Sequence, residues 1–177
     1  MKLIYATLVL LFCVNYFVSA QNSEIKAFAR SDNTHRYSII FDKMVWDAKY
    51  NSIAEQNQMD IFLVQKGRNP EDANAVIMTG SFVEPLKVKP FDKIVERDIA
   101  NMQRQSPEMT YEIIQEDLNI KNVIEYKIII FRSGNQTHKA YYLRSARTII
   151  FLIFAVKGEF EPWEKEFEKI INELVVL

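Results

Sequence analysis

Two long apolar segments constrain the fold of this chain more than any other feature. Residues 128–131 read Ile-Ile-Ile-Phe, and residues 149–156 read Ile-Ile-Phe-Leu-Ile-Phe-Ala-Val. A strand with one wet face alternates apolar and polar side chains, whereas a strand covered on both faces does not. Eight apolar residues are too few to cross a bilayer as a helix, which needs about 20. Both segments are therefore predicted to be strands in the middle of a sheet that is covered on both faces.

Two amphipathic segments can supply the covers. Pro90 precedes the first, residues 91–105, and Glu161-Pro162 opens the second. Each carries one apolar stripe at helical spacing. The two stripes consist of Phe91, Ile94, Val95, Ile99 and Met102, and of Trp163, Phe167, Ile170, Ile171 and Leu174. The chain is therefore predicted to be an α+β protein, a three-layer α/β/α sandwich with a central, mainly antiparallel sheet.

The other strands are predicted from short apolar or alternating runs between turn signals. Gly67 to Pro70 and Ser133 to Gln136 supply turn chemistry. Gly80, inside a strand pattern, suggests a bulge. Trp46 follows the first strand and is expected to plug an edge of the core. The predicted strands cover residues 37–41, 59–64, 75–82, 109–116, 123–131, 138–144 and 148–156.

The N-terminus has the three parts of a secretion signal: Met1-Lys2, an apolar run from Leu3 to Val14, and Val18-Ser19-Ala20 as a cleavage site. Residues 1–20 are therefore predicted to be removed, with export to the periplasm or secretion; the alternative is an uncleaved membrane anchor. The only cysteine, Cys13, lies inside this segment. Residues 21–36 are polar and aperiodic, which predicts a flexible leader before a single domain at 37–177.

Removing 20 of the 177 residues leaves 157, with 21 basic and 23 acidic side chains, because the signal contains one Lys and no acid. This balance argues against nucleic acid as a partner, since nucleic-acid binding usually needs a basic patch. It also gives no strong attraction to anionic membranes. No stable membrane span is expected after cleavage.

Residues that could carry catalysis are scarce. The predicted mature domain has no cysteine and two histidines, His35 and His138, and the chain has only four glycines. No G-x-S-x-G and no phosphate-binding glycine loop is present. We therefore predict no enzyme, no catalytic residue, no metal and no cofactor. Two alternatives stay open: a hydrolase that uses His138, and a carrier of a small hydrophobic ligand, suggested by twelve Phe and eight Tyr.

The hairpin at 131–147 is the preferred contact surface, because Arg and Tyr are the residue types that anchor interfaces. The alternative is a solvated hairpin end with one inward Tyr. Asn135-Gln136-Thr137 also matches a glycosylation sequon at the hairpin tip. The candidate partner-binding residues are Arg132, His138, Tyr142, Arg144 and Arg147.

From about Tyr37 to Leu174, the order of these elements resembles the Mog1/PsbP-like fold group, which includes DcrB-like exported bacterial proteins. The resemblance is carried by Ile39-Ile40-Phe41 followed by Trp46, by Ile61 to Val64, by the mid-chain helix, by the strands from Met109 and by the closing Trp163 to Leu174 helix. It implies a central antiparallel sheet with helices on both faces and no shared catalytic residues. It also implies a protein that binds other proteins, as an assembly factor, chaperone or regulator. The chain is thus expected to be an exported, non-catalytic module that binds a protein.

Overall fold

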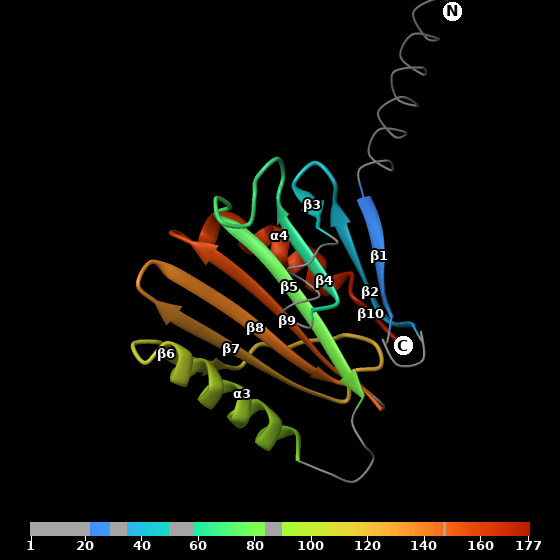
Figure 1. Cartoon of the computed structure of the whole chain (residues 1–177). Helices are drawn as coiled ribbons and strands as arrows, with labels where there is room; N and C mark the ends of the chain where they lie inside the picture. The colour runs from blue at the N-terminus through green and yellow to red at the C-terminus, as the bar shows by residue number, and fades with distance from the viewer. Residues whose placement is uncertain (1–21, 29–34, 50–58, 84–89, 147) are drawn as a thin grey trace, which may run out of the picture.

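The structure, a computed structural model, describes residues 22–28, 35–49, 59–83, 90–146 and 148–177. This part of the chain holds two helices and ten strands (Figure 1). In chain order they are β1 (Asn22–Phe28), β2 (His35–Asp42), β3 (Trp46–Ala48), β4 (Ile61–Gln65), β5 (Ala75–Val83), α3 (Phe91–Gln105), β6 (Thr110–Ile114), β7 (Glu125–Ser133), β8 (Gln136–Arg144), β9 (Thr148–Lys157), α4 (Glu161–Asn172) and β10 (Val175–Val176).

Seven strands form the main sheet, in the order β3-β4-β5-β9-β8-β7-β6, and every neighbouring pair is antiparallel. The long apolar strand β9 lies in the middle and pairs with β5 on one side and β8 on the other. The other predicted apolar run belongs to β7, one strand from the edge.

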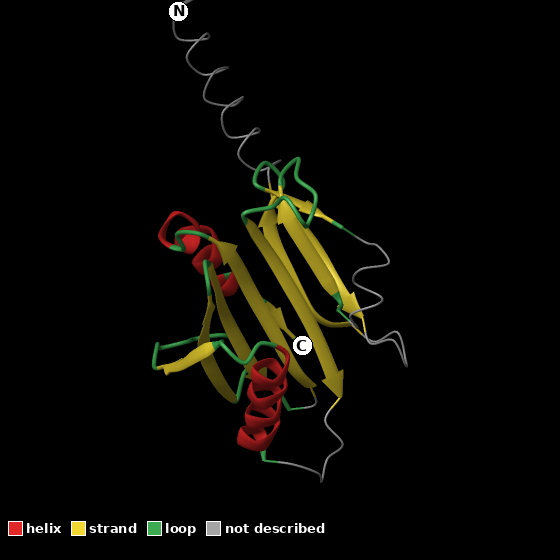
Figure 2. Cartoon of the chain, turned by 60° about the vertical axis from the view of Figure 1, so that its left-hand side comes forward, coloured by secondary structure: helices red, strands yellow, loops and turns green. Residues whose placement is uncertain are grey.

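Helices α3 and α4 lie on opposite sides of this sheet (Figures 1 and 2). On one side, Ile94 and Ile99 of α3 pack with Ile129 and Ile153 of the sheet. On the other side, Phe167 and the rest of the α4 stripe pack against the second face. Ile128 and Ile129, which point to opposite faces, are 1% and 0% exposed. The α+β sandwich and the two-sided burial of its central strands are therefore confirmed.

A second, three-stranded sheet, β1-β2-β10, shares the core on the α4 side. The predicted leader at 21–36 was wrong in this respect, since residues 22–28 form β1 and pair antiparallel with β2. The sequence conceals this strand because β1 adds to the edge of another strand, and of its described side chains only Ile25 is buried. In the sequence, Ile25, Ala27 and Phe28 do not keep the strict alternation that would mark a strand.

Buried polar contacts join the two sheets. The hydroxyl of Tyr37 in β2 donates to Asp60 at 3.0 Å and shares a hydrogen bond with Thr79 of β5 at 2.5 Å. Ser81 donates to the same carboxylate at 2.6 Å. Burial, followed by the charge of Asp60, raises the pKa of the Tyr37 phenol. These bonds supply the partners that a buried hydroxyl needs.

Two residues singled out in the sequence have clear structural roles. Gly80 forms no bulge, because β5 and β9 stay in register through the Gly80–Phe151 pair. A Cβ at Gly80 would lie 2.2 Å from the Phe151 ring, so the glycine makes room for that ring. Trp46 is 1% exposed and closes the core edge as expected. Its ring centroid lies 5.6 Å from that of Trp163 and 6.0 Å from that of Phe167.

Candidate interaction surface

The four predicted partner-binding residues that the structure describes do not form one surface. Arg132 and His138 lie near the tip of the β7–β8 hairpin, whereas Arg144 ends β8, six residues from His138. At about 3.3 Å per residue, that separation is about 20 Å. Tyr142 is only 3% exposed and packs against α3. Arg147 lies outside the described residues.

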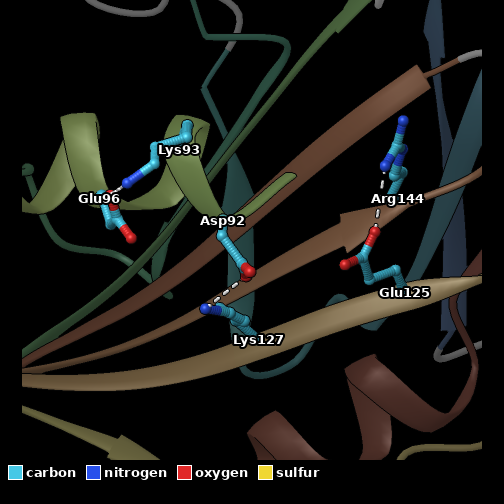
Figure 3. Close-up of polar contacts among 6 residues, drawn as sticks. All are labelled: Asp92, Lys93, Glu96, Glu125, Lys127 and Arg144. Carbon is cyan, nitrogen blue, oxygen red and sulfur yellow. Dashed lines mark hydrogen bonds and ion pairs between the residues drawn. The ribbon is translucent and has the colours of Figure 1, made fainter. Parts of the chain in front are cut away.

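Tyr142 points inward because β8 is covered on both faces. Burial, followed by the charge of Asp98, raises the pKa of its phenol. Arg144 is only partly exposed, and its guanidinium donates to Glu125 at 3.1 Å (Figure 3). Lys127 also pairs with Asp92 of α3 at 2.6 Å (Figure 3), and this hydrogen bond lowers the pKa of the Asp92 carboxyl. These ion pairs hold α3 and the strand ends together.

His138 is partly buried, and burial lowers the pKa of its imidazole. A hydrolase would need a carboxylate and a hydroxyl beside it. Among the described residues, no carboxylate perturbs or bonds this imidazole. Nor do the described residues include a group of three or more His, Cys, Asp or Glu side chains arranged to hold a metal. In the same part of the chain, no helix has the length and apolarity to cross a membrane.

Strand β6 forms one edge of the main sheet, and it is the most exposed of the strands that the structure describes in that sheet. In the described part of the chain it pairs only with β7, so its other edge is open. Four of its five residues are exposed. Tyr111 and Ile113 are 44% and 51% exposed. They pair with Phe131 and Ile129, and therefore stand on the α3 side of the sheet.

Acidic side chains accompany this open edge. The segment from Glu108 to Asp117 contains Glu108, Glu112, Glu116 and Asp117 and no basic residue. Arg132 meets Glu112 at 3.5 Å, with both side chains more than half exposed. Lys139, itself 6% exposed, donates to both carboxylate oxygens of Glu116 at 2.8 and 2.9 Å. Among the described residues, the ion pairs of these four acids involve two cations, so this edge of the sheet keeps an excess of negative charge.

An open strand edge presents unpaired N–H and C=O groups, which can pair with another strand. The exposed Tyr111 and Ile113 add apolar area beside those groups. Sequence reasoning placed a strand at 109–116 but assigned it no binding role. The missed signal is that Tyr111 and Ile113 share one face of a strand whose other face carries Thr110, Glu112 and Ile114.

No protein-family model matches the sequence, and no curated protein matches it. Solved structures do match the fold. The solution structure of cyanobacterial PsbP (CyanoP) from Synechocystis has a TM-score of 0.58 and 13% identity, over 89% of this chain and 94% of that one. The Ran-binding protein Mog1p of Saccharomyces cerevisiae has a TM-score of 0.52 and 9% identity, over 88% and 95%. LpqN of Mycobacterium tuberculosis, which is involved in cell envelope biogenesis, has a TM-score of 0.52 and 10% identity, over 92% and 95%.

Each match spans most of both chains, so the whole described architecture is shared rather than one motif. Identities of 9–13% show a common fold and carry no function with them. The resemblance to this fold group that the sequence suggested is therefore confirmed. This chain has the Mog1/PsbP-like fold.

Proposed function

We propose that this chain is an exported, non-catalytic module that binds another protein through strand β6. The observation that carries the proposal is the open β6 edge with its two exposed apolar side chains, Tyr111 and Ile113. Proteins usually shield strand edges, because an exposed apolar edge invites pairing with other chains. The fold supports the proposal in a general way, since Mog1p is a Ran-binding protein and shares it.

The proposed mode is strand addition. An extended segment of the partner pairs its backbone with β6, and its alternate side chains lie against Tyr111 and Ile113. Backbone hydrogen bonds then supply affinity, and the side-chain contacts select the sequence. Of the residues predicted from the sequence, Arg132 borders this edge through its contact with Glu112, so it belongs to the proposed surface.

Charge indicates the chemistry of the partner segment. The β6 edge carries Glu108, Glu112, Glu116 and Asp117 with two facing cations. An antiparallel pair of two copies centred on Glu112 would set the two carboxylates opposite each other, which is destabilising. We therefore propose a different protein, whose extended segment alternates apolar with basic residues. Such binding weakens as salt rises, because exposed charges are screened.

The proposal that the protein is exported rests only on its N-terminal segment. The apolar run and Val18-Ser19-Ala20 support removal of residues 1–20. N-terminal sequencing of the protein isolated from its native cells is expected to begin at Gln21. A protein that begins at Met1 and stays with the membrane fraction would favour the uncleaved anchor instead.

Substitution of Ile113 by Lys tests the binding surface. Ile113→Lys removes an exposed apolar contact and repels a basic segment, but it should shift the free energy of unfolding by no more than about 0.5 kcal/mol. Quantitative affinity purification from native cells should therefore show at least one protein that wild type captures and Ile113→Lys loses by about tenfold or more.

Met44→Lys is the matched control. Met44 is 66% exposed in the turn between β2 and β3, away from β6 in the sheet order. The Met44→Lys variant should capture the same proteins as wild type. If Ile113→Lys keeps every protein that wild type captures, β6 is not the binding edge. If Met44→Lys loses the same proteins, the added charge rather than the site is responsible.

A further inference from the structure

A cavity of about 200 Å³ opens on the α3 side of the main sheet, beyond the helix itself. Its apolar floor is formed by Val76 and Met78 of β5 and by Ala155 of β9. Val76 pairs with Ala155, and Met78 also packs against the α3 core, which fixes the side of the sheet. No residue of β6 lines the cavity, so it is separate from the proposed protein-binding edge.

The polar side chains at this cavity share one property: each can donate a hydrogen bond. They are Asn74, Gln136, His138 and Lys157, and no Asp or Glu is among the described residues that line it. Lys157 donates to the backbone carbonyl of Glu71 at 2.6 Å. A carbonyl positions the ammonium without cancelling its charge, and two N–H donors remain available. The lining therefore has a positive, donor-rich rim over an apolar floor.

Backbone hydrogen bonds hold the parts of this rim together. The Lys157 N–H donates to the Asn74 carbonyl at 2.8 Å, which ties the end of β9 to the loop before β5. The Gly158 N–H donates to the Asn135 carbonyl at 2.7 Å, which ties the same end to the β7–β8 turn. A site held in this way loses little conformational entropy when it binds a ligand.

We propose that this cavity binds a small aromatic carboxylate, with its ring on the apolar floor and its carboxylate at the rim. The size fits one ring with a short acidic arm, since a cavity of about 150 Å³ holds benzene. Ammonium, imidazole and amide donors suit a carboxylate, and an ionised acceptor strengthens the hydrogen bonds. The partly buried His138 keeps its imidazole neutral near pH 7 and so contributes one N–H donor.

Titration of the purified mature protein with phenylacetate, followed by amide NMR shifts, tests this site. Saturable shifts are expected at the ends of β5, β8 and β9, with a Kd below about 1 mM, a reasonable affinity for about ten heavy atoms. Phenylacetamide, which lacks the charge, should bind about tenfold more weakly. Acetate, which lacks the ring, should not saturate these shifts in the same range.

Three variants complete the test. Ala155→Leu fills the floor and should abolish binding, and Lys157→Gln removes the cation at an exposed position and should weaken phenylacetate binding about tenfold. Lys165→Gln, on the exposed face of α4, should bind as wild type does. The proposal is overturned if phenylacetate gives no saturable shifts at the cavity, if phenylacetamide binds equally well, or if Lys157→Gln binds unchanged. Capture of a protein partner through β6 does not depend on any of these results.

Discussion

The burial of the His138 imidazole affects how the stability of the whole protein depends on pH. Its side chain is partly buried beside Met78 and Ala155, and Lys157 is the charged residue among the described residues that line the same cavity. Burial favours the neutral form and lowers the pKa. In the unfolded chain the pKa returns to about 6.5. The unfolded chain therefore binds more protons than the folded protein at and somewhat below pH 6.5.

This difference predicts a loss of stability in mild acid. Because a depressed histidine pKa penalises protonation in the folded state, stability is full above pH 6.5 and falls as pH drops from there toward the folded pKa. The loss is about 1.4 kcal/mol for each unit by which the pKa is lowered. Urea unfolding of wild type between pH 7.5 and about 5 should show this slope, and His138→Gln should reduce it.

His35→Gln serves as the comparison, because His35 is the only other histidine in the chain. His35→Gln should keep the fall in the free energy of unfolding with falling pH that His138→Gln reduces. An unchanged slope in His138→Gln would show that the imidazole is protonated as easily in the folded protein as in the unfolded chain.

Single side chains were the least predictable level of the structure. The sequence showed that β8 is a strand and allowed for one inward Tyr, but both Tyr141 and Tyr142 are buried at 3% exposure. Adjacent residues of a strand point to opposite faces, so both can be buried only where both faces are covered. Composition at 131–147 suggested one binding surface, whereas in the structure Tyr142 is buried and Arg144 lies at the far end of β8 from Arg132 and His138.

Trp46 connects β3 to helix α4. Its indole contacts the rings of Trp163 and Phe167, which places a short edge strand against the helix stripe. Its Nε1 is buried and finds no hydrogen-bond partner among the described residues. A buried donor without a partner keeps its desolvation cost, so the indole is held by its packing alone.

Substitution of Trp46 separates these two effects. Trp46→Ala should destabilise the protein by about 3–5 kcal/mol, because it empties a fully buried aromatic site. Trp46→Phe keeps a ring and removes the unpaired N–H, so it should cost less than about 1.5 kcal/mol. Chemical unfolding followed by circular dichroism measures both. Equal losses in the two variants would show that a smaller ring cannot replace the packing of the full indole at this site.

Elements with strong local signals were predicted well. Helix α3 occupies residues 91–105 as expected, because Pro90 and Ser106-Pro107 bracket a continuous apolar stripe. Strands β1 and β10 were missed for a different reason. Each depends on pairing with β2, a long-range contact, and Val175–Val176 is too short to show any period. Their existence is decided by tertiary pairing rather than by local pattern.

At the scale of the molecule, the apolar runs in β7 and β9 predicted a sheet covered on both faces, and the structure has one. The sequence did not reveal that a second sheet, β1-β2-β10, packs together with α4 into the core on one side of the main sheet. Nor could it show which strands lie at the edges, because strand order is a property of the whole chain. The exposed edge at β6 follows from that order, and so does the proposed mode of binding.

Hydrogen exchange of the mature protein, alone and with the partner that Ile113→Lys fails to capture, tests the central proposal most directly. If the partner adds a strand to the sheet, amides in residues 110–114 should become protected on binding, while those of β3 at the opposite edge stay unchanged. Protection confined to the β3 edge or to α4, with none gained in β6, would contradict strand addition at this edge.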